Sequence, residues 1–115
     1  MKILFDHNVD RRFRRLLPGH LIQTTREMRW EQLQNGDLLK AASDASFEAF
    51  ISIDKNLRYE QNLKKLPIAI IVLDSISNAL PALTPFAPHV LQLAQAPLAR
   101  MLYTIAPDGT VTRLP

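Results

Sequence analysis

The chain of 115 residues is long enough for one domain, which would span residues 1–115, and too short for two domains of typical size. Its 47% hydrophobic and 22% charged residues exclude a disordered segment, a collagen-like repeat and a coiled-coil rod. The absence of cysteine excludes disulfides, thiolate catalysis and cysteine-bound metals, and the net charge of +3 is compatible with a polyanionic partner.

Strand and helix patterns alternate along the first half of the chain. Hydrophobic periodicity predicts a strand at 2–5, a helix at 10–17, a strand at 20–25 and a helix at 37–46. Pro18 and Gly19 end the first helix, and Asp37 stands at the start of the second, where a carboxylate is favoured by the helix dipole.

The second half continues the alternation and ends in a hairpin. The pattern predicts a strand at 50–53, a short helix at 58–66, a strand at 68–73, a helix at 84–96 and strands at 100–105 and 110–114. Asp108 and Gly109 form the turn signal between the last two strands. We therefore expect an α/β fold: a mainly parallel sheet of four or five strands, flanked by helices, with a C-terminal strand or hairpin.

Apolar residues are frequent in the second half, yet no run approaches the ~20 residues that cross a bilayer. The longest run is 67–73. We expect a cytoplasmic protein without membrane contact. The apolar surface of this half fits a homodimer, and core packing explains it equally well.

Carboxylates follow the predicted strands. Asp6, Asp54 and Asp74 each end an apolar strand, and Asp37 precedes the third strand by one helix. Parallel sheets bind ligands at the carboxyl ends of their strands, and grouped carboxylates suit Mg²⁺ or Mn²⁺. Aspartate also favours loops and helix caps, and this structural explanation is strongest for Asp37 and Asp74.

The neighbours of these acids are polar or basic. Asn8, Lys55 and Asn56 could orient the acids or contact phosphate, and His7 could be a ligand, a base or a phosphate contact. Glu31 is a possible additional acid. Four arginines of the first predicted helix form a patch that either binds RNA or is a solvated face: Arg11, Arg12, Arg14 and Arg15.

Three motifs in order resemble a family of short bacterial PIN-like proteins. They are Ile3-Leu4-Phe5-Asp6-His7-Asn8-Val9, Gly36-Asp37-Leu38-Leu39, and Ile53-Asp54-Lys55-Asn56-Leu57 followed by Gln61-Asn62-Leu63. The resemblance covers roughly residues 1–96. It implies a PIN-like fold and hydrolysis of single-stranded RNA with Mg²⁺ or Mn²⁺ bound by Asp6, Asp37 and Asp54, with Asn8 supporting Asp6.

The resemblance also implies a toxin paired with a small DNA-binding antitoxin that blocks the site. Two positions depart from the family pattern: His7 stands where an acid is usual, and Asp10 where proline is common. The change at His7 removes a negative charge from the site, so an inactive PIN-like binding module is an alternative. A further alternative is a receiver-type signalling domain phosphorylated at Asp54, although no lysine follows the fifth predicted strand.

Overall fold

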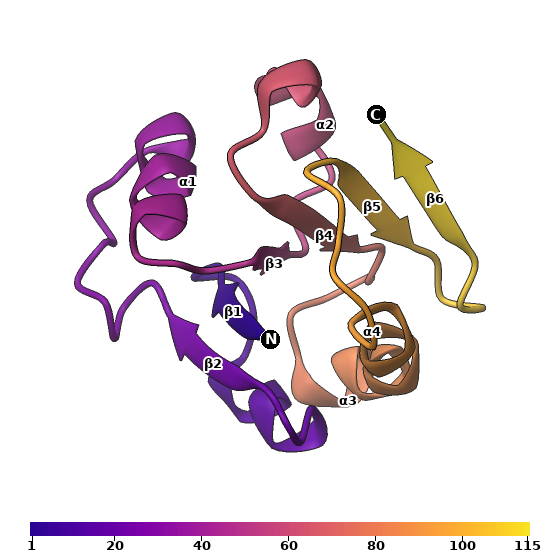
Figure 1. Ribbon diagram of the computed structural model, residues 1–115. Coiled ribbons are helices and arrows are strands. Elements are labelled where there is room, and N and C mark those ends of the chain that lie inside the picture. Colours follow the sequence, from indigo (N-terminus) through magenta and orange to yellow (C-terminus); the bar gives the residue numbers. More distant parts are fainter.

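The computed structural model describes residues 1–115 as a six-stranded sheet flanked by helices (Figure 1). The strands lie in the order β2-β1-β3-β4-β5-β6, with the first five parallel and β6 antiparallel to β5. Their bounds are Lys2–Phe5 (β1), Leu21–Thr24 (β2), Ala49–Ser52 (β3), Ala69–Leu73 (β4), Leu102–Ile105 (β5) and Val111–Leu114 (β6). The prediction of a mainly parallel α/β sheet with a C-terminal hairpin is confirmed.

The strand order reverses between β1 and β3. From β1 the chain moves outward to β2 and then returns to place β3 on the other side of β1. The connections that follow β1 and β3 therefore run in opposite directions along the sheet. Such a place is a topological switch point, where open parallel sheets commonly bind ligands. Asp6 directly follows β1 and Asp54 follows β3 after Ile53, so both acids lie at the carboxyl ends of the two strands at this switch point.

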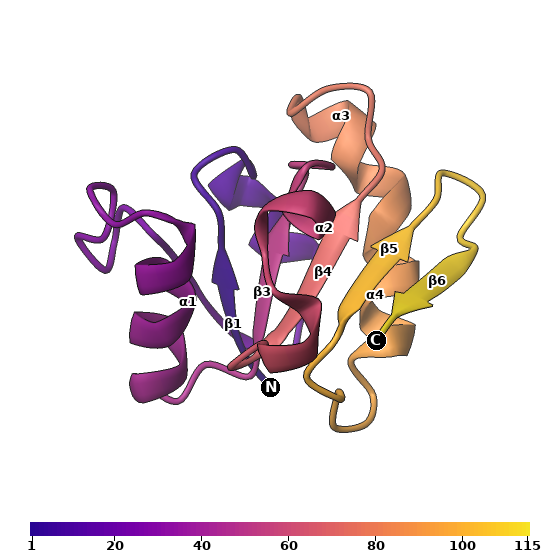
Figure 2. The same ribbon diagram turned by 90° about the horizontal axis from the view of Figure 1, so that it is seen from above.

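Helices cover both faces of the sheet (Figure 2). Helix α1 (Asn35–Asp44), helix α2 (Leu57–Glu60) and the 3-10 turn η2 (Leu63–Lys65) pack on one face, against a core that includes Leu4, Phe50 and Ile70. The 3-10 helix η1 (Arg11–Leu16), η3 (Thr84–Phe86), α3 (Leu80–Leu83) and α4 (Ala87–Leu93) pack on the other, against Phe5, Ile51 and Ile71. Leu83, Phe86 and Val90 of the apolar second half are core residues.

Two predicted α-helices take a different form. The segment predicted at 10–17 is the 3-10 helix η1, which begins after the Asp10 cap and ends before Pro18 and Gly19. The helix predicted at 58–66 breaks at Gln61, which is extended. The Asn62 side chain then accepts a hydrogen bond from the Lys64 amide and starts η2.

Prolines shorten the last predicted helix. Pro85 and Pro88 each lie in the first turn of their helix, where a missing N–H costs least. The segment therefore forms η3 followed by α4, which ends at Leu93 rather than near residue 96. None of the helices combines the length and the apolar character required to cross a membrane.

Candidate functional site

Asp6 is a buried carboxylate without a lysine or arginine partner. It is 6% exposed, and its backbone amide donates to Ile51 on β3, which fixes the residue at the end of the sheet. Its Oδ1 accepts from the His7 backbone amide at 2.8 Å and lies 2.9 Å from His7 Nδ1. His7 itself is 79% exposed, so its ring extends into solvent beside the acid.

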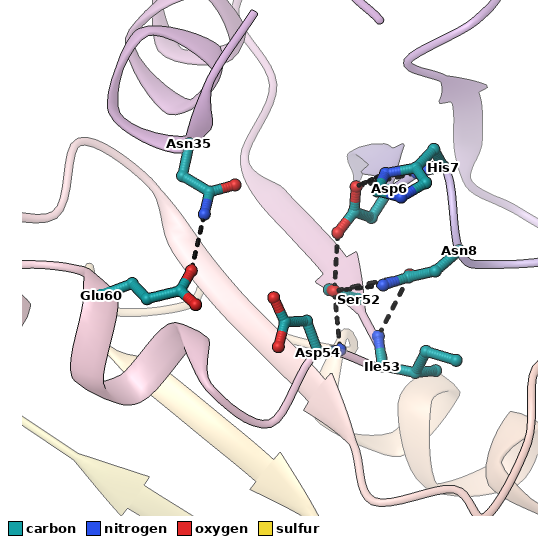
Figure 3. Close-up of polar contacts among 8 residues, drawn as sticks. All are labelled: Asp6, His7, Asn8, Asn35, Ser52, Ile53, Asp54 and Glu60. Carbon is teal, nitrogen blue, oxygen red and sulfur yellow. Dashed lines mark hydrogen bonds and ion pairs between the residues drawn. The ribbon is translucent and has the colours of Figure 1, made fainter.

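Ser52 connects the two acids that follow β1 and β3 (Figure 3). This fully buried hydroxyl donates to Asp6 Oδ2 at 2.7 Å and accepts from the Asp54 backbone amide at 3.0 Å. Asn8 also contacts it, with Nδ2 at 3.3 Å from Ser52 Oγ, while Asn8 Oδ1 accepts from the Ile53 amide. The structure therefore brings the side chains of Asp6 and Asn8 and the backbone amide of Asp54 together around one hydroxyl.

Asp37 lies outside this network. It is the third residue of α1, it is exposed, and it makes no side-chain hydrogen bond or ion pair. A carboxylate in the first turn stabilises a helix through its dipole, which accounts for Asp37 structurally. The start of α1 is instead tied to α2 through Asn35, whose amide donates to Glu60 at 2.8 Å (Figure 3).

The donor types at this edge of the sheet fit a hard divalent cation. Mg²⁺ binds through one or two carboxylates and completes its shell with water and substrate phosphate. Asp6 and Asp54 are carboxylates of that kind on neighbouring strands. The structure groups no three His, Cys, Asp or Glu side chains as metal ligands, so the set of Asp6, Asp37 and Asp54 implied by the resemblance is not assembled.

The polar residues after Asp54 have structural partners. Lys55 Nζ lies 3.2 Å from Asp74 Oδ1 and donates to the Ser75 carbonyl, which joins the ends of β3 and β4. Asn56 is exposed, and its backbone amide donates to Asp54 Oδ1 at 2.9 Å. Lys55 and Asp74 therefore compensate each other, and the Asn56 amide holds the Asp54 side chain in a turn.

The four arginines of the predicted RNA-binding patch divide into two kinds. Arg12 pairs with Asp10. Arg14 pairs with Glu27 through its two terminal nitrogens, which lie 2.8 and 2.9 Å from the two carboxylate oxygens. Arg11 and Arg15 are exposed and belong to no ion pair. Two of the four positive charges are thus already matched inside the molecule.

A hollow of about 500 Å³ adjoins Asp6 on the side of β2. Its lining consists of ten residues, Asp6, His7, Val9, Asp10, Arg11, Thr24, Thr25, Arg26, Glu27 and Glu31. Glu31, a possible additional acid from its sequence position, faces this hollow. Asp54 is not among the lining residues, so the hollow opens on one side of the Ser52 network only.

The pairing of Glu27 with Arg14 predicts an acid-dependent loss of stability. The Arg14 guanidinium, and next the Thr24 amide, lower the pKa of Glu27 from 4.5 to about 2. A depressed carboxyl pKa stabilises the folded state fully above the unfolded-state value, and the contribution is lost as the pH falls from about 4.5 to about 2. Because Glu27 is 41% exposed, we expect only about 1 kcal/mol.

The measurement is urea unfolding of the wild type and Glu27→Gln between neutral pH and pH 2.5. The wild type should be more stable at neutral pH, and the difference should shrink as the pH falls. Glu48→Gln, at an exposed position outside the helices and without a side-chain partner, is the control and should show no such trend. A Glu27→Gln difference that stays constant with pH would contradict the role of the ion pair.

Sequence reasoning missed Ser52, Glu27 and Arg26. A serine inside the apolar run 49–53 was a usable signal, because a buried hydroxyl requires a partner. Thr24 and Glu27 have the spacing of a capping box, and the structure shows the reciprocal bonds, with each backbone amide donating to the other side chain. Nothing in the sequence placed Arg26 beside Asp6.

Comparisons with known proteins provide no family for the chain. No protein-family model matches it, and neither the curated proteins nor the solved structures give a significant match. The PIN-like resemblance therefore depends on the three motifs alone. The structure shows an α/β domain with a polar network at the switch point of its sheet.

Proposed function

We propose that the protein is a metal-dependent ribonuclease that hydrolyses single-stranded RNA at the edge of the sheet formed by Asp6 and Asp54. The observation that carries the proposal is the burial of Asp6 without a lysine or arginine partner. Hydrogen bonds from the His7 amide and the Ser52 hydroxyl offset part of the cost of burying this carboxylate, but no lysine or arginine neutralises its charge, which leaves that charge for a bound cation. Asp54 on the neighbouring strand, joined through Ser52, supplies the second acid.

The residues of the network have distinct roles in this proposal. Asp6 and Asp54 would hold Mg²⁺ or Mn²⁺, which when bound polarises phosphate oxygens and lowers the pKa of bound water. Ser52 fixes the rotamer of Asp6 through its 2.7 Å hydrogen bond, and Asn8 holds the following backbone through the Ile53 amide. Asp37 contacts none of these residues, so we assign it to the helix terminus.

The experiment that tests this function is cleavage of a mixed-sequence, end-labelled single-stranded RNA in Mn²⁺, in Mg²⁺ and in EDTA. We expect cleavage in either metal and none in EDTA, with activity restored when metal is added back. Binding of Mn²⁺ is measured in parallel by calorimetry, so that metal affinity and cleavage are separate readouts.

Two outcomes discriminate the alternatives. Cleavage that persists in EDTA would overturn the metal-dependent reaction. A folded protein that neither binds Mn²⁺ nor cleaves RNA would replace the nuclease with the inactive binding module, and His7→Glu would then test whether the missing charge is the cause. Pairing with an antitoxin stays a prediction from the resemblance.

The receiver alternative shares the strand order β2-β1-β3-β4-β5, which is that of flavodoxin-like sheets. The chain after β5 is nevertheless Ala106-Pro107, followed by β6 instead of a final helix. A receiver needs a cation at the end of β5 to contact the phosphoryl group. Lys55, which follows Asp54, cannot replace it because it is paired with Asp74. Labelling of Asp54 by a small phosphodonor would reverse this preference for the nuclease.

A further inference from the structure

The hollow between the ends of β1 and β2 is lined both by Asp6 and by arginines that have no acidic partner. Two arginines line it, Arg11 from the start of η1 and Arg26 from the turn after β2. Both are exposed, and neither takes part in an ion pair. They approach the hollow from segments that are separated in sequence but share its rim with Asp6 and His7.

No acid of the hollow forms an ion pair with these two arginines. Asp10 is bonded to Arg12 and Glu27 to Arg14, and neither Asp6 nor Glu31 lies within ion-pair distance of Arg11 or Arg26. These pairs hold the pKa of both carboxyls near 2, so each pair keeps its opposite charges at neutral pH. Arg11 and Arg26 therefore remain available to an anion from solvent.

One residue that lines the hollow carries an unsatisfied polar group. Thr25 is 2% exposed, and its buried hydroxyl has no hydrogen-bond partner. Buried hydroxyls are usually hydrogen-bonded, so this one is an exception. This orphaned group and the two free guanidinium groups belong to the same hollow, next to the acid at the switch point.

We propose that Arg11 and Arg26 bind a backbone phosphate of single-stranded RNA, and that the strand enters the site along the β1–β2 side. This inference rests on the proposed function, whose site it extends. Arginine suits the role because its planar fork donates two hydrogen bonds to one phosphate. Arg12 and Arg14 do not bind RNA in this proposal. Their ion pairs stabilise η1 and the turn after β2 instead.

The experiment measures binding without cleavage. Fluorescence anisotropy of a short labelled single-stranded RNA is recorded in EDTA over a range of salt concentrations. We expect Arg11→Gln and Arg26→Gln each to weaken binding about 10-fold. The double variant should lower the slope of log affinity against log salt by about 0.7, which corresponds to one phosphate contact on a single strand.

Arg15→Gln is the matched control, because Arg15 is exposed and unpaired on the same 3-10 helix but does not line the hollow. Its affinity and salt slope should equal those of the wild type. An equal loss in Arg15→Gln, or an unchanged slope in the double variant, would overturn the inference, as would a wild type that does not bind the RNA.

The two proposals fail in different ways. If binding depends on Arg11 and Arg26 but no metal supports cleavage, the inference stands and the nuclease is wrong. If the RNA is cleaved and the double variant binds it as tightly as the wild type, the nuclease stands and the inference is wrong. Binding of a mononucleotide with the same arginine dependence and equal affinity would show a nucleotide pocket instead of an RNA path.

Discussion

Asp6→Asn is expected to reduce RNA cleavage by about 10²–10³-fold while leaving the protein folded. The substitution keeps the shape of the side chain and removes its charge, so several kcal/mol of metal-borne stabilisation of the transition state are lost. The His7 amide can still donate to an asparagine oxygen, and the Ser52 hydroxyl can turn its proton to Asn8 Oδ1, 3.5 Å away, and accept from the new amide group in place of Asn8 Nδ2. The hydrogen-bonding network therefore survives the loss of charge.

The stability of the same variant should move in the opposite direction from its activity. Asp6 is a buried charge without a lysine or arginine partner, and neutralising such a charge removes its desolvation cost. We expect the urea midpoint of Asp6→Asn to equal or exceed that of the wild type. A residue retained for packing alone would give a less stable variant with proportionate loss of activity.

Asp54→Asn and Asp44→Asn complete the comparison. Asp54→Asn should also abolish cleavage, since it removes the carboxylate that follows the neighbouring strand, whereas Asp44→Asn changes an exposed acid at the far end of α1 and should leave activity unchanged. Wild-type cleavage rates in both Asp6→Asn and Asp54→Asn would exclude this edge of the sheet as the catalytic site.

Much of the fold was predictable because the strand signals are local. The buried strands are short branched apolar runs, and β4, whose five residues are all buried, is read from composition alone. The crossings between them follow from alternation with helices. The length and type of the short helices could not be predicted. In short segments the 3-10 and α forms are close in free energy, and packing decides between them.

The candidate site was predictable only in part for a related reason. Asp6 and Asp54 were found because a carboxylate after an apolar strand lies at a definable edge of the sheet. Asp37 was chosen on a different criterion, its place at the start of the helix that leads into the third strand, and helix α1 begins at Asn35 and leaves it in an exposed first turn. The pairings of Arg12 and Arg14 depend on side-chain positions that sequence spacing does not encode, since Arg14 reaches Glu27 across 13 positions.

Phe13→Ala is expected to destabilise the protein by about 3–5 kcal/mol, the usual cost of truncating a buried phenylalanine. Phe13 is fully buried, its ring centre lies 5.9 Å from that of Phe5, and it is the one buried residue within η1. A loss of this size removes a large fraction of the 5–15 kcal/mol that holds a small domain together.

Urea unfolding measures the effect, with Phe13→Leu and Arg15→Ala as companions. Phe13→Leu retains most of the apolar volume and should cost less than Phe13→Ala, while Arg15→Ala, at an exposed position of the same helix, should stay within about 0.5 kcal/mol of the wild type. If Phe13→Ala costs less than 1 kcal/mol, η1 is not held by this ring. Helix η1 also carries Arg11 at the rim of the hollow. Phe13→Leu should therefore weaken RNA binding less than Arg11→Gln does, because it loosens the helix but leaves the phosphate-binding side chain in place.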